Sequence, residues 1–433
     1  MSTPECGKYL VRMSPKISEH PPTSPAQRTR LYLVHTIRWI VLGGFSGLLA
    51  GCASYVFLEG LDRVTAFRTD EQWMIYLLPI AGLVIGLSNK WLTGRSASGN
   101  SLLLQEIHSP TRWVPRRMAP LVLLGTWWTH LFGGSAGREG TALQMSGSLS
   151  DALGRLIKLQ HRDRSLLLTA ALAGGFGSVF GVPFAGVVFA LEVPTVGRLR
   201  LRALVPTVSA SFVGDAMVGW LGHDHVTRFS VDLSLTASTL GALIVVGVSC
   251  GIASRMFISA TSTFRNLGRR YLPSTVLRPV IGGAAVLGLS ALFGRDYLGL
   301  SLPLLDTALS GASIALTVFA LKIVFTAVTI GTGFLGGEVT PLFVIGSTLG
   351  ASVGELVGLP VGVAAAIGMV ATFGAAANTP LACTVMGLEL FGTAAVAPMA
   401  IGCLVAWVAS GSGTIYETQR HALRRSSTGL QHA

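Results

Sequence analysis

The sequence predicts an all-α polytopic membrane protein with an internal repeat, and three observations lead to this fold class. Half of the 433 residues are hydrophobic and only 12% are charged, a balance too apolar for an ordinary soluble enzyme. Several apolar stretches approach the roughly 20 residues that a membrane-spanning helix needs. Motifs of the first half of the chain recur about 198 residues later, which indicates a duplicated membrane unit.

Basic side chains outnumber acidic ones and gather at the chain ends and in short loops. Lys plus Arg total 32 against 20 Asp plus Glu, which gives a formal net charge of +12. Basic clusters beside apolar segments favour the cytoplasmic side of a membrane, so both termini are expected in the cytoplasm. Nucleic-acid binding would need basic residues interleaved with stacking aromatics, whereas the intervening residues here are mostly aliphatic. We therefore expect no nucleic-acid partner.

Three regions are expected along the chain. Residues 1–36 are polar and proline-rich and lack the pattern of a secretory signal, so we interpret them as a cytoplasmic N-terminal segment. Residues 37–416 form the transmembrane domain, and residues 417–433 form a basic C-terminal tail. Within the domain, seven stretches are long enough to span the bilayer: 37–58, 74–92, 203–221, 234–258, 276–293, 307–330 and 394–410.

Shorter apolar pieces interrupted by glycine and proline lie between these spans. They cover residues 121–132, 141–153, 165–176, 183–193, 341–353, 361–373 and 380–391, and each is too short to cross alone. Broken helices at membrane depth are tolerated only where protein or a water-filled path satisfies the freed backbone groups. The pattern therefore indicates a transporter or a channel.

The repeat relates two halves, at approximately 37–221 and 234–410. In the eleven residues 137–147 and 336–346, five positions agree: Gly137/Gly336, Glu139/Glu338, Thr141/Thr340, Leu143/Leu342 and Gly147/Gly346. Downstream, a Pro-x-Ala motif that ends in Glu occurs at Pro183 to Glu192 and again at Pro380 to Glu389. Spacing alone leaves open whether the halves are parallel or inverted.

Each repeat places glycines and a glutamate directly before an apolar helix. Unpaired backbone N–H groups and the positive end of the helix dipole at membrane depth make an anion site. Glu139 is interpreted as a gate that fills the anion's place when charged and carries a proton when neutral; the alternative is a simple helix cap. Glu192 and Glu389 are expected to be structural or to mark the membrane boundary. Asp151 is expected to face water or headgroups at a segment end.

Other reactive residue types give no competing site. The five cysteines are far apart and lie mostly in apolar segments, so they are interpreted as packing residues. His223 and His225 lack a third ligand at zinc spacing and are expected in an exposed loop. The spans contain no constellation of nucleophile and base. We expect no metal, no cofactor and no enzymatic activity.

The segment from Gly137 to Gln144 resembles the Gly-Arg-Glu-Gly-Pro signature of the CLC family of anion channels and anion/proton antiporters, with Thr141 at the usual proline. The helix ending at Glu192 is similar to a second motif of that family. The resemblance covers residues 37–416. It implies an inverted repeat of tilted and broken helices, and a homodimer with one pathway in each subunit.

The resemblance also assigns roles to individual residues. Glu139 is similar to the family's gating glutamate and Tyr416 to its anion-contacting tyrosine, while Asn100 stands at the serine of the anion loop. It further implies that an anion meets the segments around both helix starts, at Gly137, Arg138, Gly140, Val339 and Thr340. Val193 stands where chloride antiporters have an inner proton-relay glutamate, so protons need another route.

The sequence Gly337-Glu338-Val339-Thr340-Pro341 is similar to the pattern of the fluoride-exporting branch. Fluoride is small and strongly hydrated, so its site needs compact donors such as the Asn100 amide and the Thr340 hydroxyl. Glu338 is expected to be protonated or hydrogen-bonded, for example to Thr340; the alternative is a carboxyl satisfied within its own helix turn.

These features together predict a proton-coupled fluoride exporter, a fluoride/proton antiporter that confers fluoride resistance. The alternative is a CLC-type chloride/proton antiporter or a passive anion channel. The expected location is the plasma membrane, as a multi-pass protein of a bacterial inner membrane, and the expected partners are fluoride, protons, lipid and a second copy of the chain.

Overall fold

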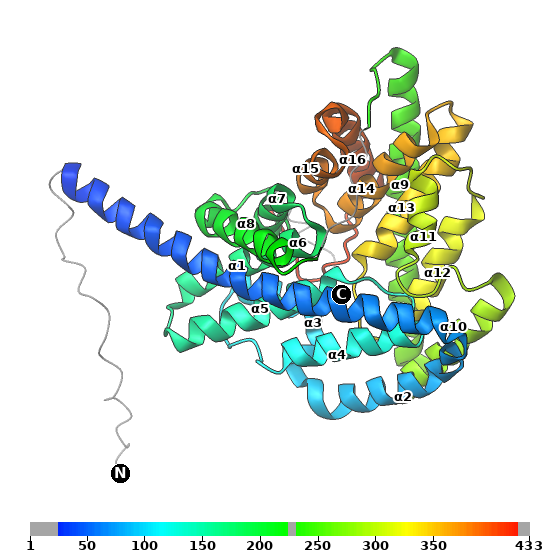
Figure 1. The fold of residues 1–433 in the computed structure, drawn as a ribbon, viewed down its shortest axis with the longest axis horizontal. Coiled ribbons are helices and arrows are strands. Elements are labelled where there is room, and N and C mark those ends of the chain that lie inside the picture. Colours follow the sequence, from blue (N-terminus) through cyan, green and yellow to red (C-terminus); the bar gives the residue numbers. More distant parts are fainter. Residues whose placement is uncertain (1–24, 224–230, 423–433) are drawn as a thin grey trace, which may run out of the picture.

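The computed structural model describes residues 25–223 and 231–422, which form helices joined by short connections (Figure 1). Two short parallel strands, β1 (Thr195–Val196) and β2 (Arg420–His421), pair near the C-terminal end. The helices are α1 (Pro25–Asp70), α2 (Leu78–Ser88), α3 (Gly99–His108), α4 (Met118–Leu131), α5 (Glu139–Leu156), α6 (His161–Phe180), α7 (Pro183–Glu192), α8 (Leu204–Trp220), α9 (Ala237–Tyr271), α10 (Leu277–Phe293), α11 (Leu302–Leu309), α12 (Thr317–Gly331), α13 (Val339–Leu356), α14 (Val361–Ala377), α15 (Pro380–Phe391) and α16 (Val396–Ser410).

Within the described residues, six helical runs are long and apolar enough to cross a membrane: Thr29–Asp70, Gln72–His108, Leu201–Trp220, Ala237–Tyr271, Val339–Leu356 and Thr393–Ser410. Two expectations about spans were wrong. The stretch 341–353, expected to be too short, is part of the 18-residue helix α13. The expected span 307–330 is broken into α11 and α12, because Gly311 takes a positive φ of 87°, which a helix does not allow.

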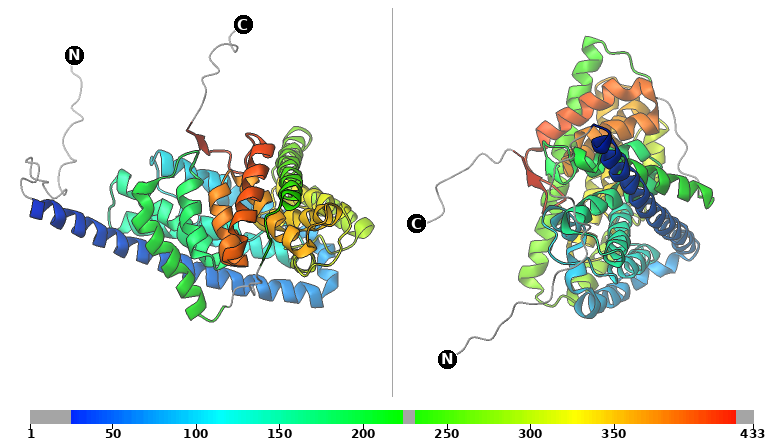
Figure 2. Two further views of the ribbon diagram at one scale, coloured as in Figure 1. Left: turned by 90° about the horizontal axis from the view of Figure 1, so that it is seen from above. Right: turned by 90° about the vertical axis from the view of Figure 1, so that its left-hand side faces the viewer.

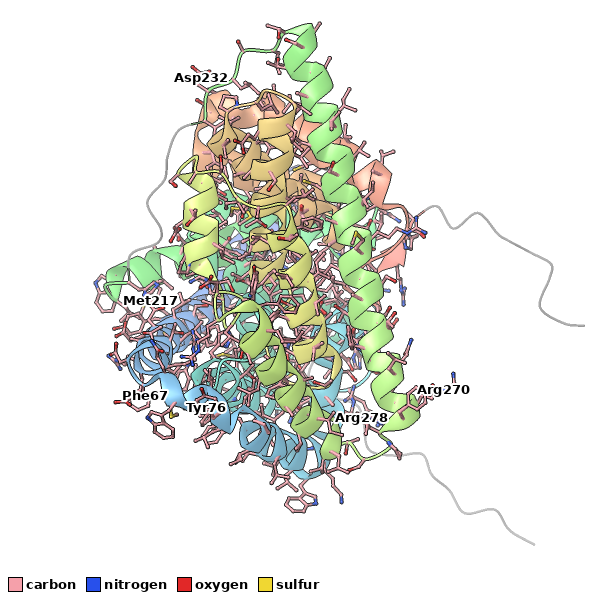
Figure 3. The ribbon with its side chains drawn as sticks, turned by 90° about the vertical axis from the view of Figure 1, so that its right-hand side faces the viewer. Phe67, Tyr76, Met217, Asp232, Arg270 and Arg278 are labelled. Carbon is pink, nitrogen blue, oxygen red and sulfur yellow. The ribbon has the colours of Figure 1, made fainter. Side chains whose placement is uncertain are left out.

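Two long helices frame the molecule. α1 lies along one side of the helix bundle (Figure 2). α9 runs along the length of the bundle, from the segment after Asp232 to Arg270 (Figure 3). α1 packs tightly on α8 because glycines line the contact: a Cβ on Gly47 would lie 2.4 Å from the Ala210 carbonyl oxygen. Small residues at such contacts let helix backbones approach closely where lipid offers no hydrophobic driving force.

The two halves of the chain are inverted relative to each other, as reciprocal contacts between α7 and α15 show. Glu389, near the end of α15, accepts hydrogen bonds from the N–H groups of Phe184 and Ala185 at the start of α7, at 2.9 and 2.7 Å. Glu192, at the end of α7, accepts from the N–H groups of Leu381 and Ala382 at the start of α15, at 3.2 and 2.8 Å.

Each carboxylate therefore caps the positive helix end of the other repeat, so α7 and α15 run antiparallel. This confirms the structural interpretation of Glu192 and Glu389.

Repeat-related aromatic side chains fill the centre of the core. The rings of Phe176 and Phe373, at matching positions of the two halves, stack with centroids 6.0 Å apart. Phe189 stacks on Phe176 at 4.2 Å, and Phe343 meets Phe373 edge-on at 5.6 Å. The same cluster holds the buried Cys250, Cys383 and Cys403, which are free thiols, in agreement with the packing role expected for cysteine.

A buried ion network links α3, α5 and α6 and corrects the expectation for Asp151, which is 1% exposed. The Arg164 guanidinium donates from Nε to Asp151 Oδ1 at 2.5 Å and from Nη1 to Glu106 Oε2 at 3.0 Å. Arg95 donates to Glu106 Oε1 at 2.8 Å, and the Arg164 guanidinium lies over the Trp113 ring at 4.7 Å. The charges are balanced and hydrogen-bonded, as buried ions must be.

Arg164→Met is expected to destabilise the protein by about 3–5 kcal/mol, because it leaves two buried carboxylates without their main partner. Thermal unfolding in detergent measures this effect. The matched control is Arg63→Met, which removes the exposed Arg63–Glu59 pair of α1 and should cost no more than about 1 kcal/mol. Adding Glu106→Gln and Asp151→Asn to Arg164→Met should recover part of the loss. If Arg164→Met has the same unfolding midpoint as Arg63→Met, the buried ion network does not stabilise the protein as proposed.

Candidate functional site

The starts of α5 and α13 meet at the interface between the two repeats. Gly137 and Gly337 form an antiparallel bridge, in which each N–H donates to the other's carbonyl oxygen at 2.7 Å. A Cβ on Gly337 would lie 2.8 Å from the Gly140 nitrogen, so only glycine permits this approach. In this conformation the Gly137 N–H is used by the bridge and is not a donor for an ion.

Glu139 is the first residue of α5, and its fully buried carboxylate reaches across to the other repeat. It accepts hydrogen bonds from the backbone N–H of Thr340 at 3.0 Å and from the Thr340 hydroxyl. Arg138 Nε lies 3.9 Å from the same carboxylate. The carboxylate therefore occupies the donors at the start of α13, where an anion would otherwise bind.

Thr340 thus pairs with Glu139 and not with Glu338, which corrects the expected Glu338–Thr340 contact. Glu338 precedes α13 and makes no side-chain hydrogen bond to that helix start, so the alternative of a self-capping carboxyl is also wrong. The Glu338 side chain instead lines an open cavity of about 710 Å³. The physical reason is the inter-repeat bridge, which brings Glu139 within reach of the donors that Glu338 was expected to use.

Asn100 lines the same cavity as Glu338, at the start of α3. Its Oδ1 atom is buried without a hydrogen-bond partner, and its Nδ2 atom lies 3.3 Å from the position of a Cβ on Gly140. Arg265 and Glu417 form an ion pair at the cavity wall. The cavity therefore leads from the surface to the amide of Asn100 beside the start of α5.

Tyr416 lies in the loop that follows α16 and is 4% exposed. Its ring packs edge-on against Phe189 at a centroid distance of 6.3 Å, and its neighbours Ile415 and Glu417 line the cavity that also holds Asn100 and Glu338. Tyr416, Asn100, Glu139, Glu338 and Thr340 come from four separate segments of the chain. The structure brings these predicted residues around one region.

Thr141, at the proline position of the family signature, makes a hydrogen bond that proline could not. Its hydroxyl lies 2.6 Å from the Thr126 hydroxyl of α4, and both side chains are buried. The pair joins α5 to α4. This departure from the signature therefore adds a hydrogen bond between two helices close to Glu139.

An amide network that sequence reasoning missed holds the Tyr416 loop. Asn378 ends α14 in the left-handed conformation, with φ 54°, which asparagine tolerates better than most residues. Its Nδ2 atom donates to the Gly413 carbonyl and to Gln419 Oε1, each at 3.2 Å, and Trp407 donates to its Oδ1 at 3.0 Å. Gln419 in turn donates to the carbonyls of Val193 and Ala377, each at 2.9 Å.

Gln419→Leu is expected to slow anion transport, because it removes one acceptor of the Asn378 amide and the donor to the Val193 and Ala377 carbonyls, and so loosens the loop that carries Tyr416. The unpaired buried groups should also cost about 1–3 kcal/mol of stability. Initial efflux rates from liposomes and thermal unfolding test both effects. Thr418→Val, which removes the nearby hydroxyl bond to the Ser101 carbonyl, is the control. Equal rates in the two variants would show that Gln419 does not position the loop.

The chain matches the voltage gated chloride channel family over residues 81–411. It belongs to this family. The chloride/fluoride channel protein of Pseudomonas syringae pv. tomato is 41% identical, over 90% of this chain and 87% of that one. The crystal structure of a CLC-type fluoride/proton antiporter superposes with a TM-score of 0.86 at 33% identity, and covers 93% of this chain and 100% of that chain.

A slow cyanobacterial Cl⁻/H⁺ antiporter shares the CLC fold at 20% identity, with a TM-score of 0.73 over 86% of this chain and 94% of that one. The expected CLC-type fold and family are therefore confirmed, and the chain is a multi-pass membrane protein of a transporter and channel family. His225 lies outside the described residues. The part of the chain that the structure describes has no cluster of three metal-binding side chains.

Proposed function

We propose that this protein exports fluoride in exchange for protons and so confers fluoride resistance. The observation that carries the proposal is the contact of the buried Glu139 carboxylate with the N–H and hydroxyl groups of Thr340. One ionisable group there competes with an anion for compact donors. The likeness to a CLC-type fluoride/proton antiporter and to a chloride/fluoride channel protein supports the choice of ion.

The exchange follows from this competition. When Glu139 takes up a proton, its hold on the Thr340 donors weakens, because the charge that attracted them is gone. A fluoride ion can then take the same donors, together with those of Asn100 and Tyr416 and the segments at Arg138, Gly140 and Val339. When Glu139 releases the proton, its carboxylate displaces the ion. Binding of proton and anion is therefore linked through one side chain.

Glu338 is proposed to set selectivity and coupling with Thr340. It lines the cavity that reaches Asn100, on the side of the Arg265–Glu417 pair. No acid occupies the Val193 position, whose carbonyl accepts from Gln419. We assign Glu338, the cavity-lining carboxyl directly before α13, as the group that carries a proton between the cavity and Glu139.

We further propose a homodimer in a bacterial inner membrane, with both termini in the cytoplasm and residues 37–416 as the transmembrane domain. Large apolar side chains remain exposed on the helices at the end of each repeat, among them Phe184 of α7, Leu381 of α15 and Val408 of α16. Lipid or a second copy must cover them.

Efflux from liposomes tests the proposed function. Purified protein is reconstituted into vesicles loaded with either fluoride or chloride, and an ion electrode records release while a dye reports lumenal pH. Fluoride release much faster than chloride release, with proton uptake against a pH gradient, is the expected result. Comparable chloride exchange would favour a chloride/proton antiporter, and fluoride flux without proton movement would favour a passive channel.

A further inference from the structure

A strongly basic cavity lies beside the β1–β2 pair, separate from the gate and from the cavity that holds Asn100. It has a volume of about 1040 Å³, and five arginines line it: Arg162, Arg198, Arg200, Arg202 and Arg420. Three histidines add to the lining, and no acidic residue does so among the residues that the structure describes. Guanidinium groups gathered without carboxylates are the donors that phosphate groups prefer.

The positive charges of this cavity are not neutralised from within. Arg162, Arg198 and Arg202 are exposed and form no ion pair in the described parts of the chain. Asp163, the acid nearest in sequence, is bound by Arg38 at 2.7 Å. The half-buried Arg200 donates only to neutral partners, the Ser165 hydroxyl and the Ile107 carbonyl.

Burial and the nearby charge of Arg420 lower the pKa of Arg200. The cavity therefore holds positive charge that an anion would balance.

The cavity opens where a membrane span begins. Leu199 and Leu201 belong to its lining and are 37% and 63% exposed, and the apolar run Leu201–Trp220 starts at the same point. Leu204 continues the exposed apolar strip along α8. A soluble phosphate compound would bind the arginines but leave the leucine side chains exposed to solvent. A ligand with a phosphate head and an acyl chain would cover both surfaces.

We propose that this cavity binds the phosphate headgroup of an anionic phospholipid, with an acyl chain along Leu201 and Leu204, and that the bound lipid supports transport. The cavity walls come from the segments that carry the anion site. His108 ends α3, the helix that starts beside Asn100, and Arg420 follows Tyr416 by four residues.

The Arg420 side chain already donates to the Ser109 hydroxyl at 3.1 Å, and its N–H donates to the Pro194 carbonyl at 3.2 Å. A phosphate bridging Arg420 and Arg198 would tie these segments together and steady the Tyr416 loop.

Lipid retention tests the binding site without relying on transport. Full-length protein is purified from vesicles of phosphatidylcholine and phosphatidylglycerol, and native mass spectrometry counts the phosphatidylglycerol that remains. The cavity variant carries Arg162→Gln, Arg198→Gln and Arg202→Gln. The control variant removes the same charge from exposed arginines outside the cavity: Arg30→Gln, Arg116→Gln and Arg270→Gln. The cavity variant should retain less phosphatidylglycerol by on the order of tenfold or more, and the control should retain as much as wild type.

Equal retention by the two variants would overturn the site. Inorganic pyrophosphate distinguishes a soluble phosphate compound from a lipid headgroup. The lipid assignment is wrong if pyrophosphate raises the unfolding midpoint of wild type but not of the cavity variant, while phosphatidylglycerol raises the midpoint of neither protein.

For the effect on transport, anion efflux by wild type should rise with the phosphatidylglycerol fraction, and efflux by the cavity variant should not. The control variant corrects for the surface charge of the vesicles. If efflux by the cavity variant rises with the phosphatidylglycerol fraction as it does in wild type, the proposal that the bound lipid supports transport is wrong.

Discussion

Replacing Glu139 by glutamine is expected to abolish proton coupling. Glutamine keeps the size of the protonated side chain, so the contact with Thr340 changes little in shape. It cannot release a proton, so the step in which the charged carboxylate displaces the anion is lost. A fluoride gradient should then drive no protons, and turnover should slow by at least about tenfold, the effect of raising the barrier by about 1.4 kcal/mol.

The measurement is simultaneous recording of fluoride release and lumenal pH at clamped voltage. Glu355→Gln is the matched control, because Glu355 is an exposed carboxylate near the end of α13 that accepts a bond from Ser313 at 2.7 Å. This control should keep wild-type coupling. Wild-type coupling in Glu139→Gln would remove Glu139 from the proton pathway, whatever its contacts.

Much of the site could be predicted from sequence because its chemistry lies in contiguous motifs. Glycines and a glutamate before an apolar helix specify a helix start that can approach an ion, and the repetition of the pattern indicates two such starts. Glu139 was identified in this way, whereas Thr340 was identified through the resemblance to the fluoride-exporting branch. Their contact could not be predicted, because it depends on how closely the Gly137–Gly337 bridge brings the two repeats together.

Groups that act through distant partners were the ones that sequence reasoning missed. Asp151 looks like a surface acid in sequence, and only the fold places Arg164 at 2.5 Å from it. Asn378 and Gln419 are 41 residues apart, and the hydrogen bond between them ties α14 to the segment that carries Tyr416. Spacing along the chain reports helix faces and turns, whereas such pairs are decided by packing between elements.

The Glu338 and Thr340 side chains are expected to set the preference for fluoride over chloride. Two variants at each position separate the effect of the hydrogen-bonding group from the effects of charge and side-chain shape. Thr340→Val keeps the branched shape and loses the hydroxyl that now binds Glu139, while Thr340→Ser keeps the hydroxyl. A hydrogen bond to a charged partner is worth about 1.5–3 kcal/mol. A strongly hydrated ion depends more on each donor than a weakly hydrated one. Thr340→Val should therefore lower the ratio of fluoride efflux to chloride efflux by on the order of tenfold or more, and Thr340→Ser should preserve this ratio.

At Glu338, the isosteric and the apolar replacements are expected to give different results. Glu338→Gln retains a donor in the cavity beside Asn100, so selectivity should persist if the native carboxyl acts in its protonated form. Glu338→Ile removes the donor and, like Thr340→Val, should lower the ratio of fluoride efflux to chloride efflux. Both replacements should weaken proton coupling, because neither side chain can pass a proton to Glu139. Paired fluoride and chloride efflux at equal reconstituted protein measures the ratio, and lumenal pH measures the coupling. If Glu338→Ile keeps both at wild-type values, Glu338 only shapes the cavity wall, and selectivity then resides in Asn100, Tyr416 and the donors at the start of α13.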